Sequence, residues 1–241
     1  MLKTTLKVDC FGMSDIGHVR ENNEDAWKAI PKMGLFMVAD GVGGQVGGQV
    51  ASQEAVSYLG ESFHDLEKGE MARTIQKTNA WIYQKGQGDP TLRGMGTTIC
   101  CLYFKNEEAV LGHVGDSRIY LLREGALKQL TKDHSLFGEL MSLDIMKPEE
   151  AKHFPYKHVL TKALGTKSTV EPSITTLPVE ENDLFLLCTD GLTNYVSDQE
   201  IRGILVGEET LERGGYLLVD LAKKHGGGDN ITVLLVKISR S

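Results

Sequence analysis

Short runs of apolar and β-branched residues recur along most of the chain and have the length and composition of strands. We expect strands in the segment KTTLKVDCF (3–11) and over 35–39, 97–104, 109–114, 118–122, 184–188 and 231–238. Asn106 and the pair Glu124-Gly125 fall where hairpin turns would lie between neighbouring runs. The middle of the chain is therefore predicted to be an antiparallel meander.

Two pairs of segments show helical spacing instead. In the first pair, one stretch carries apolar residues on a single helical face, which consists of Ala55, Val56, Leu59, Phe63 and Leu66. The other stretch runs from about 70 to 87. The second pair covers 198–205 and 211–224, and Ser197 with Glu200 has the form of a capping box. Because strands are grouped with strands and helices with helices, we expect α+β layers rather than a βαβ repeat.

The segment 135–156 fits neither period, since it mixes a short helical signal with Pro148 and Pro155. Long irregular insertions often carry function, so we interpret it as a flap over a binding site. An ordinary surface excursion is the alternative.

Composition narrows the class of protein. With 241 residues, 41% hydrophobic and 24% charged, the chain is expected to form a single globular domain, 1–241. A net charge of −7 argues against nucleic-acid binding. There is no apolar signal core at the start and no run long enough to cross a membrane, so we expect a cytoplasmic protein. The four cysteines form no C-x-x-C pair and are expected to be reduced core residues.

Aspartate recurs beside or near glycine at the ends of predicted strands in this sequence. Asp40 and Asp190 each end an apolar run and precede a glycine, Asp116 follows Gly115, and Asp229 follows a Gly-rich run before the last strand. A single such aspartate is most often a turn residue that bonds its own backbone. Four of them indicate a cluster of carboxylates.

Converging carboxylates repel one another, so at neutral pH the cluster requires cations or protonation. Oxygen ligands favour Mg²⁺ or Mn²⁺, and no Cys or His pair has zinc spacing. The glycines after Asp40 (Gly43, Gly44, Gly47 and Gly48) suggest close approach of a ligand, but they match neither a P-loop nor a dinucleotide fingerprint.

Three further side chains are candidates near this cluster. Arg20 lies in the acidic segment 14–25 and could bind a phosphate through two bonds, although a structural ion pair is the alternative. His113 is out of phase with Asp116 along its strand, so we expect it to be packed rather than catalytic. His134 is expected to belong to a turn network.

Eight segments together resemble the metal-dependent type 2C (PPM) serine/threonine protein phosphatases, in their compact bacterial form. They occur in family order and span nearly the whole chain: Ser14-Asp15-x-Gly17-x-x-Arg20-x-x-Asn23-Glu24-Asp25, Ala39-Asp40-Gly41-x-Gly43-Gly44, Gly96-Thr97-Thr98, Gly115-Asp116-Ser117-Arg118-x-Tyr120, Leu130-Thr131-x-Asp133-His134-Ser135, Leu160-Thr161-x-Ala163-Leu164-Gly165, Cys188-Thr189-Asp190-Gly191-Leu192 and Gly228-Asp229-Asn230-Ile231-Thr232.

The resemblance implies a four-layer αββα sandwich, in which helix pairs flank two antiparallel sheets and metals lie in a cleft at one edge. It also implies a role for each matching residue. Asp40 would bridge two Mn²⁺ or Mg²⁺ ions, the Gly41 carbonyl would bind one of them, and Asp190 and Asp229 would complete the other. Asp116 would hold a third, weaker ion together with Asp190. Glu24 and Asp25 would act mainly through metal-bound waters, Arg20 would grip the substrate phosphate, and Asn230 would support Asp229.

The expected reaction is hydrolysis of phosphoserine and phosphothreonine in proteins by a hydroxide that the metals activate, with no phosphoenzyme. The resemblance makes an opposing serine/threonine kinase and a role in signalling expected, and we expect a monomer. Many relatives outside bacteria carry a histidine where this chain has Val42, so the acid that protonates the leaving group must differ. Our hypothesis is a water on the third metal, held by Asp116.

Two other functions remain open at this point. A pseudophosphatase would bind phosphoproteins without hydrolysing them, but it would be expected to have lost metal ligands, and all four aspartates are present. A metal-dependent phosphohydrolase acting on small metabolites is the second alternative.

Overall fold

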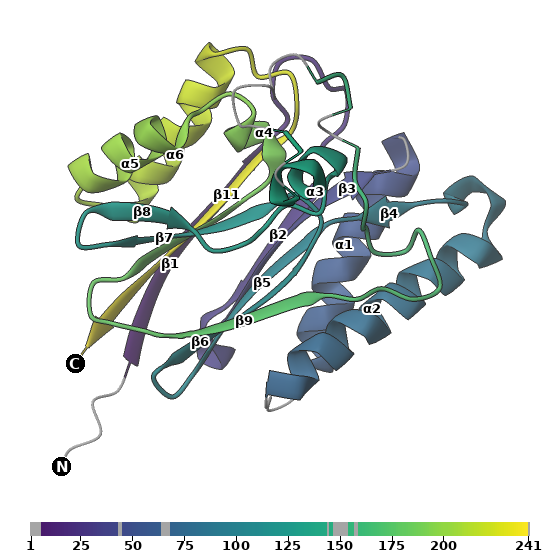
Figure 1. Ribbon diagram of the computed structural model, residues 1–241, viewed down its shortest axis with the longest axis horizontal. Helices are drawn as coiled ribbons and strands as arrows, with labels where there is room; N and C mark the ends of the chain where they lie inside the picture. Colours follow the sequence, from purple (N-terminus) through teal and green to yellow (C-terminus); the bar gives the residue numbers. More distant parts are fainter. Residues whose placement is uncertain are drawn as a thin grey trace.

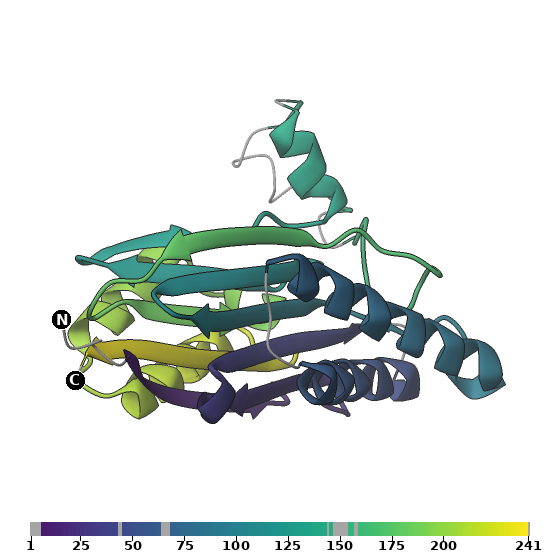
Figure 2. The same cartoon turned by 90° about the horizontal axis from the view of Figure 1, so that it is seen from below.

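Two antiparallel sheets face each other at the centre of the molecule, and a pair of helices covers the outer face of each (Figures 1 and 2). The computed structural model describes residues 6–42, 45–63, 68–143, 145–146, 154–156 and 159–240. The predicted four-layer α+β sandwich is confirmed.

The first sheet has the strand order β1-β11-β10-β7-β8 within the described ranges. Its strands are β1 (Leu6–Asp15), β11 (Ile231–Arg240), β10 (Leu184–Cys188), β7 (Arg118–Arg123) and β8 (Ala126–Gln129). Helices α5 (Asp198–Gly207) and α6 (Leu211–Lys224) pack on its outer face.

The second sheet has the order β2-β3-β5-β6-β9 over the same described residues, with β4 paired to the end of β3. Its strands are β2 (Asp25–Ile30), β3 (Leu35–Val42), β4 (Gly96–Thr97), β5 (Ile99–Lys105), β6 (Glu108–Val114) and β9 (Ser173–Pro178). Helices α1 (Gln45–Ser62) and α2 (Lys68–Gly88) cover it.

Alternation along the central strands divides the core into layers. On β3, Phe36 and Val38 point toward the other sheet, whereas Leu35 and Met37 point toward the helices. All four side chains are fully buried. A strand with both faces covered is apolar at every position, which is why 35–39 is a continuous apolar run.

The predicted local signals agree with the structure. Asn106, Glu124 and Gly125 have positive φ at the two hairpin turns. Ser197 and Glu200 form the capping box at the start of α5. The predicted strands and helices are all present where the structure describes them; residues 3–5 of the first strand and Leu66 of the first helix lie outside the described ranges.

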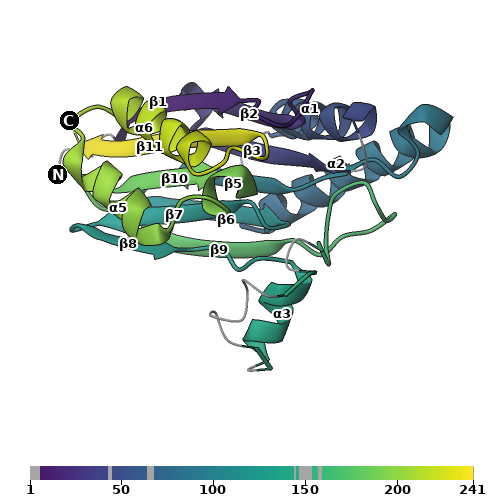
Figure 3. The same cartoon turned by 90° about the horizontal axis from the view of Figure 1, so that it is seen from above.

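Shorter elements connect the layers: η1 (Pro31–Met33), η2 (Pro90–Leu92), α3 (Leu136–Ser142) and α4 (Asp190–Thr193). Helix α3 belongs to the predicted flap and stands away from the sandwich (Figures 2 and 3). Residues 144 and 147–153 of the flap, Pro148 among them, lie outside the described residues, as do 157–158 just beyond it and Gly43 and Gly44. The flap's role stays a prediction.

Candidate active site

A cavity of about 450 Å³ opens at one end of the sandwich, where segments from both sheets meet. Five acidic residues line it, and they come from positions that are far apart in the sequence. Its walls are formed by Arg20, Glu24, Asp40, Gly41, Val42, Asp116, Leu160, Asp190, Asn194, Tyr195, Asp229 and Asn230. The structure thus brings together the four strand-end aspartates that the sequence singled out.

Asp40 is held by its backbone at the end of β3. Its N–H donates to Thr98 Oγ1 over 2.9 Å, and its carbonyl accepts the Thr98 N–H at 2.8 Å and the Thr97 hydroxyl at 2.9 Å. These three bonds fix the peptide of Asp40, which lines the cavity.

Gly41 allows the chain to pass very close to its neighbours. A Cβ at this position would lie 2.2 Å from the Gly48 carbonyl oxygen of helix α1 and 2.8 Å from the Glu24 carbonyl oxygen. The Gly41 N–H also donates to that Glu24 carbonyl over 3.1 Å. Glycine is required here, and the contact brings Glu24 beside Asp40.

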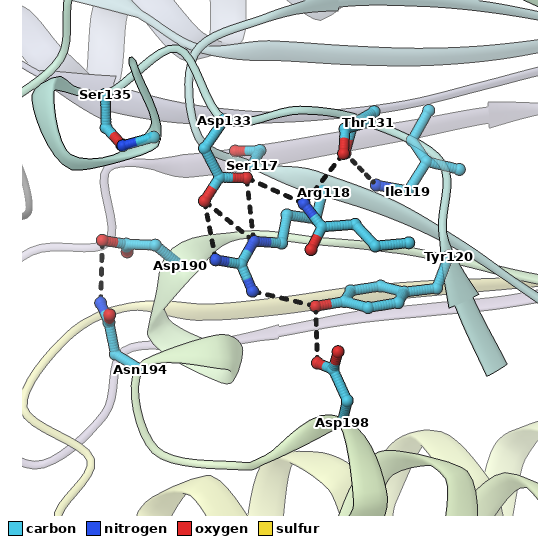
Figure 4. A network of polar contacts seen from close by, with 12 residues as sticks. Ser117, Arg118, Ile119, Tyr120, Thr131, Asp133, Ser135, Asp190, Asn194 and Asp198 are labelled. Carbon is cyan, nitrogen blue, oxygen red and sulfur yellow. Dashed lines mark hydrogen bonds and ion pairs between the residues drawn. The ribbon is translucent and has the colours of Figure 1, made fainter. Parts of the chain in front are cut away.

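Asp190 is the first residue of the short helix α4, directly after β10. Its Oδ2 accepts a bond from the Asn194 side chain at 2.9 Å, as Figure 4 shows. A Cβ on the next residue, Gly191, would lie 1.9 Å from the Asn230 carbonyl oxygen. Close backbone packing therefore fixes α4 against the segment that carries Asp229.

Asn230 organises the loop between β1 and β2. Its side-chain amide donates to the carbonyls of Ile16 and Asn22, both at 3.0 Å, and its Oδ1 accepts the Glu24 N–H at 2.8 Å. Its own N–H donates to Asp229 Oδ1 over 2.8 Å. The Asn230 side chain therefore holds the loop that carries Arg20 and Glu24, and its backbone contacts Asp229; a role of Asn230 in supporting Asp229 as a ligand stays a prediction.

Arg20 donates to Asp229 Oδ2 over 2.8 Å in this structure. Half of the Arg20 side chain is exposed, so the guanidinium lies at the cavity mouth rather than in the core. The ion pair anticipated as the alternative for Arg20 is present, and the same position also suits contact with a bound phosphate.

Asp25 is buried and does not line the cavity. Its Oδ2 accepts bonds from the hydroxyls of Thr189 and Thr232, at 2.8 and 2.6 Å, so it joins the second sheet to the first. Among the described residues its buried Oδ1 has no hydrogen-bond partner. That atom is one that a water or cation could satisfy.

The carboxylates perturb one another strongly. Burial, followed by the charges of Asp25 and Asp190, raises the pKa of Asp40 well above the ordinary range. Burial and then Asp190 raise the pKa of Asp116 to about 8, and burial raises that of Asp25 to about 7 against two hydroxyl bonds that lower it. When all of its carboxylates are ionised and no positive charge compensates them, the cluster lowers the stability of the folded protein.

The donor set fits hard divalent cations, since it offers carboxylate and carbonyl oxygens without a soft ligand. Within the described ranges, however, no group of three or more Asp, Glu, His or Cys side chains is already arranged to hold an ion. The Arg20 guanidinium instead provides positive charge at Asp229. We conclude that the residues suit a metal in kind, and that their side chains would have to turn toward it.

The turn after β6 is anchored by a polar network centred on Arg118. Arg118 contacts both carboxylate oxygens of Asp133 and donates to the Tyr120 hydroxyl, which in turn donates to Asp198 (Figure 4). The Arg118–Asp133 pair is mostly buried. It ties the segment beside Asp116 to Asp133, which lies two residues before the flap.

The two histidines behave as the sequence predicts. His113 is 2% exposed and stacks on His134 with ring centroids 4.5 Å apart. His134 Nδ1 accepts the Gly115 N–H at 3.1 Å, and its Nε2 lies 2.9 Å from the Ser173 hydroxyl. Burial lowers the pKa of His113 to about 3 and that of His134 to about 4, so both are neutral structural groups near pH 7.

The cysteines do not reach this site. All four carry free thiols, and Cys100, Cys101 and Cys188 are fully buried. Burial raises the pKa of the Cys188 thiol to about 12, so it supplies no thiolate nucleophile.

Part of the cavity wall was not found from the sequence. Tyr195 and Leu160 line it, and neither carries a charge that would have drawn attention. Tyr195 packs so closely on the Gly226–Gly228 run that a Cβ on Gly228 would lie 2.2 Å from its hydroxyl oxygen. Its place five residues after Asp190 was the one available signal.

Comparison with known proteins gives consistent matches. The family model for protein phosphatase 2C matches residues 17–213. The chain is 37% identical over 235 residues to the serine/threonine phosphatase stp of Listeria innocua, covering 93% of both chains. It is 38% identical to the protein phosphatase PhpP of Streptococcus pneumoniae, covering 94% of this chain and 96% of PhpP.

Among solved structures, the catalytic domain of the serine/threonine protein phosphatase PstP, in complex with two manganese ions, superimposes with a TM-score of 0.88 at 35% identity. The match covers 98% of this chain and all of PstP's.

Proposed function

Since the chain belongs to the protein phosphatase 2C family and is a metal-dependent serine/threonine protein phosphatase, we propose that its active site is the acidic cavity. The observation that carries the proposal is the convergence of Asp40, Asp116, Asp190 and Asp229 on one cavity. Burial first, and then the charges of neighbouring carboxylates, raises the pKa of Asp40 and of Asp116, so the ionised cluster calls for cations. The catalytic domain is proposed to span residues 1–241.

Each carboxylate has a proposed part in holding the ions. Asp40 and the Gly41 carbonyl, with Asp190 and Asp229, would hold two core ions, Mn²⁺ or Mg²⁺. Asp116 would hold a third, weaker ion together with Asp190. Manganese is supported by the PstP structure, whose two ions lie in a protein of the same fold.

Glu24 and Asp25 are proposed to act through waters that the ions hold. The Glu24 side chain lies on the cavity wall. Asp25 is buried and does not line the cavity. Its Oδ1, which has no hydrogen-bond partner among the described residues, is the atom through which it would contact such a water.

When bound, the ions supply a nucleophile from water at neutral pH and positive charge for the phosphoryl oxygens. The protein's own residues supply binding and orientation. Arg20 would bind the substrate phosphate after leaving Asp229, for which its half-exposed position at the mouth is suited. Asn230 would keep the Arg20 loop in place through its bonds to Ile16 and Asn22. Val42 lines the cavity but has no proton to give to the leaving group.

The substrates are proposed to be phosphoproteins produced by a cognate serine/threonine kinase, and the enzyme to be a cytoplasmic monomer. No helix in the described part of the chain has the length and apolar character that a membrane crossing needs. The retained carboxylates speak against a pseudophosphatase.

The test is hydrolysis of a phosphothreonine peptide and of an aryl phosphate with Mn²⁺, with Mg²⁺ and with chelator. We expect chelation to abolish turnover and Asp40→Asn to lower kcat/KM by more than about 100-fold, since losing a residue that only orients a ligand costs about 10- to 100-fold. Asp220→Asn is the matched control, because Asp220 pairs with Lys224 on the surface of α6. Turnover by Asp40→Asn at the wild-type rate would refute the assignment.

A further inference from the structure

The Gly96-Thr97-Thr98 motif has no role in the proposed mechanism, yet Thr98 lies between two of the aspartates. It immediately precedes β5, which is the strand between β3 and β6 in the second sheet. Asp40 lies two residues beyond Val38, the last residue of β3 that pairs with β5, and Asp116 lies two residues beyond Val114, the last residue of β6 that does so. Regular sheet pairing between these strands therefore ends just before either carboxylate.

On the side of β3, Thr98 forms two hydrogen bonds with the backbone of Asp40. The Thr98 N–H donates to the Asp40 carbonyl at 2.8 Å, and the Thr98 hydroxyl oxygen accepts the Asp40 N–H at 2.9 Å. Thr98 is fully buried, so water cannot replace that acceptor. The hydroxyl thereby satisfies the backbone donor of the predicted bridging ligand.

On the other side, the same hydroxyl contacts the turn that carries Asp116. Thr98 Oγ1 lies 2.6 Å from Ser117 Oγ, and both residues are fully buried. Because Thr98 Oγ1 accepts the Asp40 N–H, the Thr98 O–H can itself donate to Ser117 Oγ. One hydroxyl thus joins Asp40 to the residue that follows Asp116.

The methyl group of Thr98 makes a second contact with this turn. Gly115 has φ +109°, and a Cβ there would lie 2.5 Å from Thr98 Cγ2. Thr98 consequently touches the residues on both sides of Asp116, through its methyl at Gly115 and through its hydroxyl at Ser117. The turn cannot shift along the sheet without breaking one of these contacts.

We propose that Thr98 is a positioning residue that sets the separation of the Asp40 and Asp116 carboxylates, with Ser117 as its partner. This inference rests on the proposed function, in which both carboxylates hold metal. Thr98 does not line the cavity and touches neither substrate nor reacting atoms. It acts through the backbone of the ligands.

The test compares Thr98→Val, which keeps the shape but removes the hydroxyl, with Thr98→Ser, which keeps the hydroxyl and removes the methyl. We expect Thr98→Val to lower kcat on the phosphothreonine peptide by about 10- to 100-fold and to leave KM for the peptide within about twofold, because the change acts on metal ligands and not on peptide contacts. Calorimetric titration with Mn²⁺, without substrate, should show weaker binding by a similar factor. Thr98→Ser should keep most of the wild-type kcat and most of the wild-type affinity for Mn²⁺.

Thr78→Val is the matched control. Thr78 is fully buried in α2 and donates to the Thr74 carbonyl over 2.9 Å, away from the cavity. This variant should lose thermal stability but keep wild-type Mn²⁺ affinity and kcat at temperatures where it is folded. The inference is overturned by wild-type Mn²⁺ binding and kcat in Thr98→Val, by an equal kinetic loss in Thr78→Val, or by failure of Thr98→Ser to restore binding.

Asp40→Asn, measured in parallel, distinguishes failure of the active-site assignment from failure of the positioning role of Thr98. If Asp40→Asn loses Mn²⁺ binding while Thr98→Val does not, the positioning role fails and the active-site assignment stands. If Asp40→Asn itself binds Mn²⁺ and turns over like the wild type, the active-site assignment fails, and the role of Thr98 fails with it.

Discussion

Replacing Asp25 by Asn should change the way in which the stability of the metal-free protein depends on pH. Asp25 is 8% exposed, and its pKa is about 7 in the folded chain, against 3.8 for an ordinary aspartate. Burial is the main cause, and the charges of Asp190 and Asp229 add to it. An acid whose pKa is raised by folding binds protons more tightly in the folded state. Its ionisation therefore destabilises the fold as pH rises.

The size of the effect follows from the two pKa values. Below about pH 4 the carboxyl is protonated in both states and causes no loss of stability. Between about 4 and 7 it is ionised only in the unfolded chain, so the free energy of unfolding falls as pH rises. Each pKa unit corresponds to about 1.4 kcal/mol, so the complete loss is about 4 kcal/mol above pH 7.

Asn has no such titration. Its amide can keep an oxygen toward the hydroxyls of Thr189 and Thr232, and its NH₂ group would replace the Oδ1 that has no hydrogen-bond partner among the described residues. An unsatisfied NH₂ costs about 1–3 kcal/mol at every pH. We therefore expect the variant to be less stable than the wild type at pH 4.5 and more stable at pH 8.

Urea unfolding in the presence of chelator, at pH values from 4.5 to 8, measures this difference. The stability of the variant relative to the wild type should increase by about 3–4 kcal/mol over that range. Thermal midpoints should follow by roughly 2–4 °C per kcal/mol for a chain of this size. A difference that stays constant with pH would show that Asp25 does not carry the burial penalty, and the reasoning would be wrong.

Three further substitutions test separate parts of the structure. Ser197→Ala removes the N-cap of α5 and should cost about 1 kcal/mol in urea unfolding, with kcat unchanged. Arg118→Met leaves the largely buried carboxylate of Asp133 without its main partner and should cost about 3–5 kcal/mol, whereas a cost below 1 kcal/mol would show that the pair contributes little. Gly191→Ala places a Cβ 1.9 Å from the Asn230 carbonyl oxygen, so soluble expression and activity should both fall; a fully active, equally stable variant would contradict the close packing.

The elements that the sequence predicted are those whose burial leaves a clear pattern. Strands β3 and β10 are covered on both faces and appear as continuous apolar runs. Strand β9 was not predicted, because as an edge strand with only partly buried residues, SITTLP, it has little apolar character. Strand β2 was missed because its sequence, DAWKAI, begins inside a run of polar residues that resembled a loop.

The candidate site was predictable where residue type alone indicates chemistry. Four aspartates beside glycines at strand ends, Asp40 and Asp190 among them, indicate a cluster of ligands without any knowledge of the fold, although one alone would most often be a turn residue. The side chains that hold these ligands gave no such signal. Thr98 acts through a contact across neighbouring strands, and Tyr195 lines the cavity because a glycine run elsewhere in the chain makes room for it. Such roles depend on distances that only the folded chain defines.

The cavity has its walls in both sheets, with Asp40 at the end of β3 in one and Asp190 after β10 in the other. A cation held between them would bind only after the two sheets have docked, so metal binding and the docked state are linked by mass action. At one hundred times the dissociation constant, such a ligand adds about 2.7 kcal/mol to the free energy of unfolding. A chelated preparation should therefore unfold at lower temperature, and the metal concentration of a buffer becomes a thermodynamic variable of the fold.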